Sequence, residues 1–217
     1  MKAVYFTEHG GPEVLKFGEL PEPTPGEGEV KIKVKACALN RLDVYTRAGV
    51  RGTKMDLTEP HVLGADVSGE VVEIGPKVTR VSAGDRVVVN PRITCMQCRY
   101  CQSNQSEYCS SAGMVGSAIR GGYAEYVVVP ATNAFPIPDN LSHVQAASLP
   151  TVFMPSWNIL IRRSQLKPWE TALVPSASSG VGTAAIQVAK NIAKSTVIAT
   201  TSTVEKAEKA TALGSDH

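Results

Sequence analysis

The 217-residue chain lacks several features that would each restrict its function. No window approaches the roughly 18–20 consecutive apolar residues that a membrane-spanning helix needs. Its 22 Lys and Arg against 20 Asp and Glu leave a net charge of only +2, without a dense basic block, so nothing indicates a nucleic-acid or membrane partner. The amino terminus shows neither a secretory signal nor a basic transit segment, and we expect a cytoplasmic protein.

Cysteine is also scarce, but four of the five cysteines fall within one short segment. The spacing of Cys95, Cys98, Cys101 and Cys109 allows four thiolates to enclose one tetrahedral zinc ion. The segment lacks the Cys-Pro pair that often closes an iron–sulfur run. Four sulfur ligands leave zinc no open position, so one structural zinc per chain is predicted. Two disulfides or four free thiols are the alternative.

The first part of the chain has the period-two pattern of half-buried strands. Apolar residues alternate with Lys31, Lys33 and Lys35 between Glu29 and Ala38. Further β patterns follow at 67–74, 86–90 and 123–129, separated by turn residues. We therefore predict a β-rich domain over residues 1–140, with the cysteine lobe at about 92–112 inserted between two of its strands.

After residue 140 the pattern becomes an alternation of helices and strands. Helical patterns at 143–149 and 154–164 precede a strand at 171–174, a helix at 182–193, a strand at 196–199 and a helix at 204–213. Such alternation predicts parallel strands joined by a crossover helix. Residues 141–217 thus form the beginning of an α/β domain whose parallel sheet is incomplete, and it should leave apolar faces exposed.

A small-residue turn links the strand at 171–174 to the helix that follows. We expect Ser179, Gly180, Val181 and Gly182 to let a pyrophosphate approach the helix amino terminus. A strict Gly-x-Gly-x-x-Gly pattern is absent, because only Gly182 keeps its position. The alternative is an ordinary strand-to-helix turn.

The tip of the next strand carries no Asp or Glu to bind the ribose of NAD. Thr201, Ser202 and Lys206 could instead hold a 2′-phosphate, which favours NADP(H) over NAD(H). The same Ser/Thr run could simply cap the next helix, or do both.

Several motifs then combine in one resemblance. They are Met1-Lys-Ala-Val, Gly11-Pro-Glu-Val-Leu15, Ala38-Leu-Asn-Arg-Leu-Asp43, His61-Val-Leu-Gly-Ala-Asp66, Gly84-Asp-Arg-Val87, the cysteine lobe and Ala177-Ser-Ser-Gly-Val-Gly182. Over essentially its whole length the chain resembles the medium-chain dehydrogenase/reductase superfamily. The resemblance implies a GroES-like catalytic domain, a Rossmann cofactor domain of which only a part is present, an active site in the cleft between them, and a homo-oligomeric full-length protein.

The chain departs from the zinc alcohol dehydrogenases of that superfamily at the catalytic metal. Asn40 stands where they have a cysteine ligand, Ala65 where they have a histidine, and Thr151 near a further ligand. A catalytic zinc needs three protein ligands besides its water, so a Lewis-acid mechanism lacks its parts. Cys37, His61 and Asp66 are an alternative ligand set, but Cys37 alternates in phase with the lysines of its strand.

The stretch from Asn40 to Gly49 instead looks like the N-x-x-D-x-Y-x-R-x-G stretch of the zinc-independent quinone reductases. That resemblance implies hydride transfer from NADPH to a small carbonyl, enone or quinone substrate. Asn40 and Tyr45 would donate hydrogen bonds to the substrate oxygen, with Tyr45 or a water completing protonation, while Asp43 orders the loop. The other interpretations are a turn residue for Asn40 and a wall residue for Tyr45.

Two alternatives for the whole chain stay open. One is a zinc-dependent alcohol dehydrogenase with other metal ligands, and the other is a non-catalytic, zinc-stabilised module that binds a partner or itself. His9 and His143 lie beside turn and helix-start signals and are interpreted as surface or capping residues.

Overall fold

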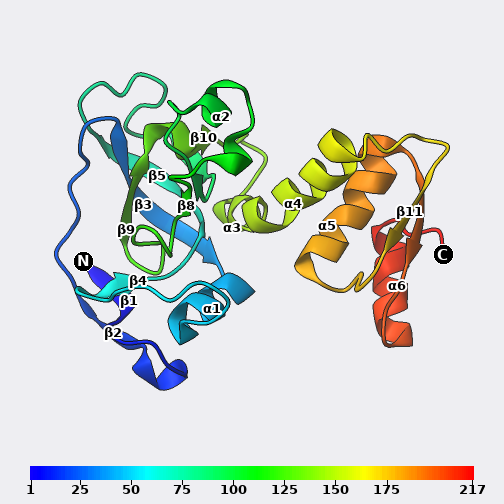
Figure 1. Ribbon diagram of the computed structural model, residues 1–217, viewed down its shortest axis with the longest axis horizontal. Helices are drawn as coiled ribbons and strands as arrows, with labels where there is room; N and C mark the ends of the chain where they lie inside the picture. Colours follow the sequence, from blue (N-terminus) through cyan, green and yellow to red (C-terminus); the bar gives the residue numbers. More distant parts are fainter. The chain divides into compact units, whose positions relative to one another are not determined.

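Strand β3 (Glu29–Ala38) forms where the sequence alternation predicts it. Val30 and Ile32 are fully buried, while Lys33 and Lys35 stay exposed. In the computed structural model, which describes all 217 residues, β3 pairs antiparallel with its two neighbours in a five-stranded sheet of order β10-β6-β5-β3-β9 (Figure 1). The other strands are β5 (Asp66–Ile74), β6 (Arg86–Val89), β9 (Tyr126–Pro130) and β10 (Ala134–Pro136).

This sheet encloses the main hydrophobic core. The core consists of β-branched and small side chains from all five strands and adjoining loops, which suit a pleated surface. Its buried members are Val30, Ile32, Val67, Val71, Val81, Val87, Val89, Val115, Val127, Val129, Ala131 and Ala134.

A β-bulge corrects one expectation about β3. Val34 pairs with Gly69 and Ala36 with Ser68, so Lys35 is an extra residue in the ladder. The bulge reverses the side-chain phase beyond it. Cys37 therefore packs against the core and does not point outward with the lysines.

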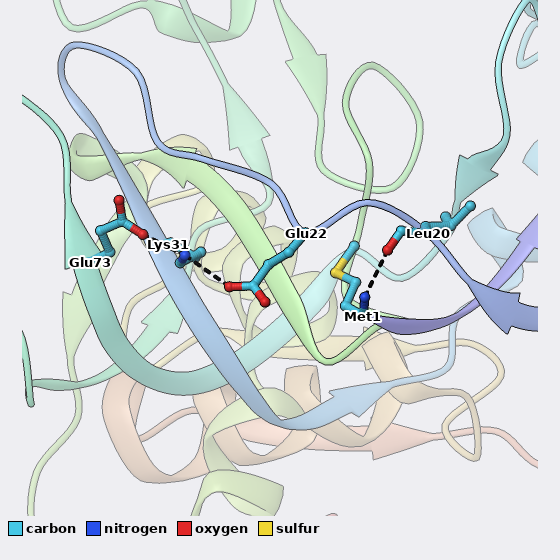
Figure 2. Close-up of polar contacts among 5 residues, drawn as sticks. All are labelled: Met1, Leu20, Glu22, Lys31 and Glu73. Carbon is cyan, nitrogen blue, oxygen red and sulfur yellow. Dashed lines mark hydrogen bonds and ion pairs between the residues drawn. The ribbon is translucent and has the colours of Figure 1, made fainter.

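A second, three-stranded antiparallel sheet has the order β2-β1-β4. It comprises β1 (Lys2–Phe6), β2 (Lys16–Glu19) and β4 (His61–Val62), and the one-turn helix η1 (Pro12–Val14) lies between the first two strands. The amino group of Met1 donates to the carbonyl of Leu20, 2.7 Å away (Figure 2). Strands β2 and β4 are too short to show a period in the sequence.

One lysine ties the loop after β2 to the main sheet. The ammonium group of Lys31 lies between the carboxylates of Glu22 and Glu73, with Glu22 Oε1 at 3.0 Å (Figure 2). Hydrogen bonds to Glu73 and then Glu22 raise the pKa of Lys31. The Lys31 side chain is only 12% exposed, so its two ion pairs cover the solvent-facing side of β3 at this position.

Helix α1 (Arg41–Ala48) replaces the loop expected around Asp43. Asn40 is its N-cap, and Gly49, at φ 67°, ends it in the left-handed conformation. The ring of His9 holds its carboxyl end, because Nδ1 lies 3.0 Å from the carbonyl oxygen of Thr46 and Nε2 accepts from the Met55 amide at 3.1 Å. His9 is thus half-buried and stabilises the carboxyl end of α1, so it is not a surface residue.

Helix α3 (His143–Ala147) packs on β3, β5 and β6. Ser142 caps it, and His143 Nδ1 lies 2.9 Å from Ser68 Oγ. Because the Ser68 hydroxyl donates its proton to the Val87 carbonyl, the histidine nitrogen must be the donor. His143, interpreted from the sequence as a surface or capping residue, is thus half-buried and joins α3 to β5. The chain divides into two compact units after Pro150 and not after residue 140, because α3 packs on the sheet of the first unit.

The second unit, Thr151–His217, contains the expected alternation. Helix α4 (Pro150–Trp157) begins at the boundary and continues as a π-helical segment, η4 (Asn158–Arg163). Strand β11 (Thr171–Val174) then pairs in parallel with β12 (Thr196–Ala199). Between them run α5 (Gly180–Val188) and the π-helical η5 (Ala189–Ala193), and α6 (Val204–Leu213) follows.

One face of this two-stranded sheet is covered and the other is open. Ala172, Val174 and Val197 form a core with residues of α5, η5 and α6. The alternate side chains of Leu173 and Ile198 are 62% and 37% exposed. The expected exposure of apolar surface in this part of the chain is therefore present. No helix of either unit is both long and apolar enough to cross a bilayer.

The contact between α3 and the sheet generates a pH-dependent prediction. Burial, followed by Arg86 and Lys35, lowers the pKa of His143 below its ordinary value of 6.5. The unfolded chain therefore takes up a proton at a pH where the folded chain does not, and stability falls as the pH drops through about 6.5. Urea unfolding at about pH 7.5 and 5.5 should show a smaller loss for His143→Gln than for the wild type.

The matched control is His217→Gln, which changes an exposed terminal ring. It should leave the wild-type difference between the two pH values in place. An equal loss of stability in the wild type and in His143→Gln would contradict the role of this histidine.

Candidate metal centre and candidate active site

The cysteine lobe leaves and rejoins the main unit through a short hairpin. Strand β7 (Arg92–Ile93) pairs antiparallel with β8 (Gly113–Met114), and this pairing closes the base of the lobe. The buried amide of Asn133 donates to the carbonyls of Asn90 and Arg92 at 2.7 and 2.8 Å. These hydrogen bonds therefore hold the base of the cysteine lobe against the core of the first unit.

Short helical turns place the four cysteines. Cys98 is the N-cap of α2 (Arg99–Gln102), which contains Cys101. Cys109 directly follows the 3₁₀ turn η2 (Ser106–Tyr108) and is buried. Cys95 precedes a left-handed residue, Met96, at φ 57°, which turns the chain back so that the Cys98 amide donates to Cys95 Sγ.

The four sulfur atoms have the geometry of a zinc site. All lie within 4.8 Å of one another, and three of the pairs measure 3.5, 3.5 and 3.9 Å. A tetrahedral ion with Zn–S bonds of about 2.3 Å places its sulfurs about 3.8 Å apart. A disulfide would need about 2.05 Å, and all four cysteines are unpaired. The residues present thus fit the predicted structural zinc, and the disulfide alternative does not describe this lobe.

The thiol environments differ within the cluster. Backbone amides of Gln97 and Cys98 lower the pKa of Cys95 to about 6, whereas desolvation raises the pKa of Cys101 to about 11. Without a cation, the four sulfurs cannot all be thiolates at neutral pH. Zinc binding must therefore release protons, and the affinity of this centre should rise with pH.

We predict that Cys109→Ser loses the zinc and lowers the melting temperature by an amount on the order of 10 °C, because metal binding stabilises the lobe. Cys37→Ser is the matched control, since Cys37 lies outside the cluster, and it should retain one zinc per chain. Elemental analysis and thermal melts measure both. Full zinc content in Cys109→Ser would contradict the assignment of the ligands.

A second polar cluster lies where β3 ends, α1 begins and β5 starts. Asp43, only 7% exposed, accepts the backbone amide of Asn40 at 2.8 Å, that of Gly64 at 3.0 Å and the Tyr123 hydroxyl at 2.9 Å. Asp66, 1% exposed, accepts from Asn40 Nδ2 at 3.0 Å. The cluster therefore joins three separate stretches of the first unit: Asn40 with Asp43, Gly64 with Asp66, and Tyr123.

Glycine is needed at the centre of this cluster. Gly64 has φ 102°, and a Cβ there would lie 2.7 Å from the Tyr123 ring and 2.8 Å from Cys37 Sγ. The segment around Gly122 passes equally close, because its amide donates to the Gly64 carbonyl. Other residues thus pack closely around the backbone of the Gly64 turn. This packing fixes the positions of Ala65 and Asp66, which follow the turn.

Buried carboxylates dominate the electrostatics here. Burial and the charges of Asp43 and Asp66 raise the pKa of Cys37 to about 12 and also raise the pKa of the Tyr123 hydroxyl. Both groups therefore stay protonated at neutral pH. His61 Nε2 instead lies 3.2 Å from the Gly116 carbonyl oxygen, and burial lowers its pKa. Cys37, His61 and Asp66 do not gather as a three-ligand metal group.

Tyr45 lies on α1 beyond this cluster. Its ring is half-buried beneath the Arg51 guanidinium, 4.8 Å from the ring centroid. No hydrogen bond joins Tyr45 to Asn40. The structure therefore brings Asn40 against Asp66, and it brings Tyr123 to the Asp43 carboxylate that Asn40 also contacts. The motif His61-Val-Leu-Gly-Ala-Asp66 was a signal for Asp66, but nothing in the pattern pointed to Tyr123.

The small-residue turn of the second unit caps α5. Ser179 is the N-cap, and its hydroxyl accepts the Gly182 amide at 3.0 Å. A Cβ on Gly182 would lie 2.5 Å from the Ser176 carbonyl, so glycine permits close packing of helix and turn. The amides of Gly180 and Val181 have no acceptor within the chain and lie at the exposed start of the helix.

The tip of β12 combines a cap with a basic group. Thr203 caps α6 by accepting the Lys206 amide, and Thr201 donates to the Thr203 carbonyl. The Lys206 ammonium lies 3.1 Å from Ser202 Oγ. Ser202 and Lys206 are therefore neighbours at the surface, and the helix-capping alternative describes Thr203.

A β-rich unit with a four-cysteine lobe, followed by two parallel strands with helices packed on one face, is the arrangement expected of the medium-chain dehydrogenase/reductase class. Residues 26–139, more than half of the chain, match the alcohol dehydrogenase GroES-like domain family. The chain belongs to this family.

Individual relatives come from two branches of the class. The chain is 33% identical over 222 residues to an NAD-dependent alcohol dehydrogenase of Sulfurisphaera tokodaii, with 100% of this chain and 63% of the relative covered. It is 32% identical over 191 residues to a quinone oxidoreductase of Lama guanicoe, covering 88% and 49%. A crystal structure of an NAD-dependent alcohol dehydrogenase superposes with a TM-score of 0.95 at 43% identity, covering 100% and 62%. The chain thus spans less than two thirds of the length of these relatives.

Proposed function

We propose that this chain belongs to a reductase without a catalytic zinc, which passes a hydride from NADPH to an enone or quinone. The hydrogen bond from Asn40 Nδ2 to Asp66 Oδ2 carries this proposal. An amide offers zinc no thiolate, imidazole or carboxylate, which are the ligands that zinc takes from proteins. The atom that would bind a catalytic metal in an alcohol dehydrogenase is here a hydrogen-bond donor.

Asn40 suits the stabilisation of a substrate oxygen. Reduction of a conjugated carbonyl places negative charge on its oxygen, and a fixed donor stabilises that charge. The neighbouring side chains of Leu39 and Val44 are apolar and 83% and 46% exposed, so they offer an apolar surface to such a substrate. Tyr45 is the second proposed donor and the source of the proton, directly or through a water.

The second unit would bind the diphosphate of the cofactor at the start of α5. The unpaired amides of Gly180 and Val181 suit an anion, and the Ser179 cap with the close approach at Gly182 fixes that turn. The cofactor supplies the hydride. Thr201, Ser202 and Lys206 would hold its 2′-phosphate, supported by the contact between Lys206 and Ser202 and by the lack of Asp or Glu between residues 199 and 204.

A second candidate is a zinc-dependent alcohol dehydrogenase. The Sulfurisphaera tokodaii relative and the superposed crystal structure favour it, because both are named as NAD-dependent alcohol dehydrogenases. Such an enzyme needs a second zinc with an open coordination position.

These two candidates make opposite predictions for the intact gene product. We expect one zinc per chain by elemental analysis, NADPH oxidation with enones or quinones, and no zinc-dependent oxidation of simple alcohols. Two zincs per chain together with alcohol oxidation would establish the second candidate. If the protein binds no nicotinamide cofactor and reduces neither substrate class, the remaining candidate is the non-catalytic, zinc-stabilised module.

The cofactor preference gives a separate prediction. Lys206→Ala should raise the KM for NADPH roughly tenfold, because a charge-assisted hydrogen bond to phosphate is lost, and leave the KM for NADH unchanged. Lys209→Ala is the matched control, since Lys209 pairs with Glu205 on the same helix. Steady-state kinetics with both cofactors measure the effect. Equal changes for NADPH and NADH would contradict the assignment of a 2′-phosphate site.

A further inference from the structure

Asn40 is held at both its backbone and its side chain by buried carboxylates. Its backbone amide donates to Asp43 and its side-chain amide donates to Asp66. Both aspartates lie almost entirely out of solvent. Burying two carboxylates near each other is unfavourable unless donors compensate them. Asp43 has three such donors, and the Asn40 amide is a donor to Asp66.

The carboxylate of Asp66 also fixes which way the amide of Asn40 points. The nitrogen of the amide faces Asp66, since Asn40 Nδ2 donates to Asp66 Oδ2 at 3.0 Å. Turning the amide over would place its oxygen against a carboxylate oxygen and break this hydrogen bond. One N–H of Nδ2 is used by Asp66, and the other N–H remains available as a donor.

We propose that Asp66 is a positioning residue, which orients Asn40 so that a substrate oxygen meets an N–H. This inference rests on the proposed function, since it names what prepares the Asn40 donor for that reaction. It goes beyond it in assigning a role to a carboxylate that touches neither substrate nor cofactor. The buried charge behind the amide also disfavours a substrate that carries its own carboxylate, so the site should prefer neutral enones and quinones.

A reciprocal exchange separates positioning from a merely structural role. Asp66→Asn keeps an acceptor for Asn40 but lets either amide turn over, so kcat should fall roughly tenfold with little change in the KM for NADPH. The double variant Asn40→Asp with Asp66→Asn restores one donor and one acceptor across the pair. It should melt near the wild-type temperature, yet keep a kcat on the order of 100-fold below wild type, because the outward group is now an acceptor.

The kinetic test uses the intact gene product with a neutral enone and with its carboxylate-bearing analogue. We expect Asp66→Asn to lower the ratio of kcat/KM for the neutral enone to kcat/KM for the carboxylate-bearing analogue. Asp139→Asn, which removes an exposed carboxylate, is the control and should change neither rate nor preference. Recovery of wild-type kcat in the exchanged double variant would overturn the inference, because a structural pair works in either direction.

A second measurement does not depend on activity. In ¹⁵N-labelled 217-residue chain, the side-chain amide protons of Asn40 should exchange slowly with solvent, and Asp66→Ala should make them exchange fast. Fast exchange in the wild-type chain would overturn the inference. If the wild-type protein reduces no enone or quinone, the proposed function fails, and this exchange rate alone then decides whether Asp66 orients Asn40.

Discussion

The buried carboxylate of Asp43 is the constraint on which the first unit's candidate site depends. It accepts hydrogen bonds from the start of α1, from the Gly64 turn and from Tyr123, which lie far apart in sequence. An unpaired carboxylate at 7% exposure would be strongly destabilising, so these three donors must assemble together. The positions of Asn40 and Asp66 follow from this assembly, because Asn40 contributes one of the donors and Asp66 lies two residues after Gly64.

The candidate metal centre and the candidate active site are separate clusters of residues in the first unit. The four sulfurs of the lobe enclose a volume suited to zinc and leave it no position for a substrate. In the polar cluster around Asn40, the backbone amide of Asn40 donates to Asp43 and its side-chain amide donates to Asp66. The lobe therefore contributes stability to the unit, whereas the proposed chemistry depends on a neutral donor oriented by buried charge.

Much of this architecture could be predicted from the sequence because its signals are local. The alternation in β3, the helix and strand pattern of the second unit and the cysteine spacing each reflect neighbouring residues. Helix α1 could not be predicted so well, since the Asp43 carboxylate at its start is itself held by Gly64 and Tyr123, which are distant in sequence. The bulge at Lys35 likewise depends on pairing with β5, and it reversed the predicted direction of Cys37.

The residues of the candidate site also differ in whether local sequence signals could predict them. Asn40 and the Ser179–Gly182 turn were identified from motifs, and the structure supplies their hydrogen-bond partners. Asp66 and Tyr123 could be assigned only from the fold, because their contacts with Asn40 and Asp43 span 26 and 80 residues of sequence. Their roles depend on long-range packing, which periodicity and spacing do not report.

We propose that the protein holds a single, structural zinc and that Asn40 takes no part in metal binding. X-ray absorption at the zinc edge of the intact gene product tests it most directly, since sulfur and lighter ligands scatter differently. A single zinc held by the four cysteines gives a shell of sulfur alone, at about 2.3 Å. A shell that mixes sulfur with nitrogen or oxygen ligands at about 2.0–2.1 Å would contradict it.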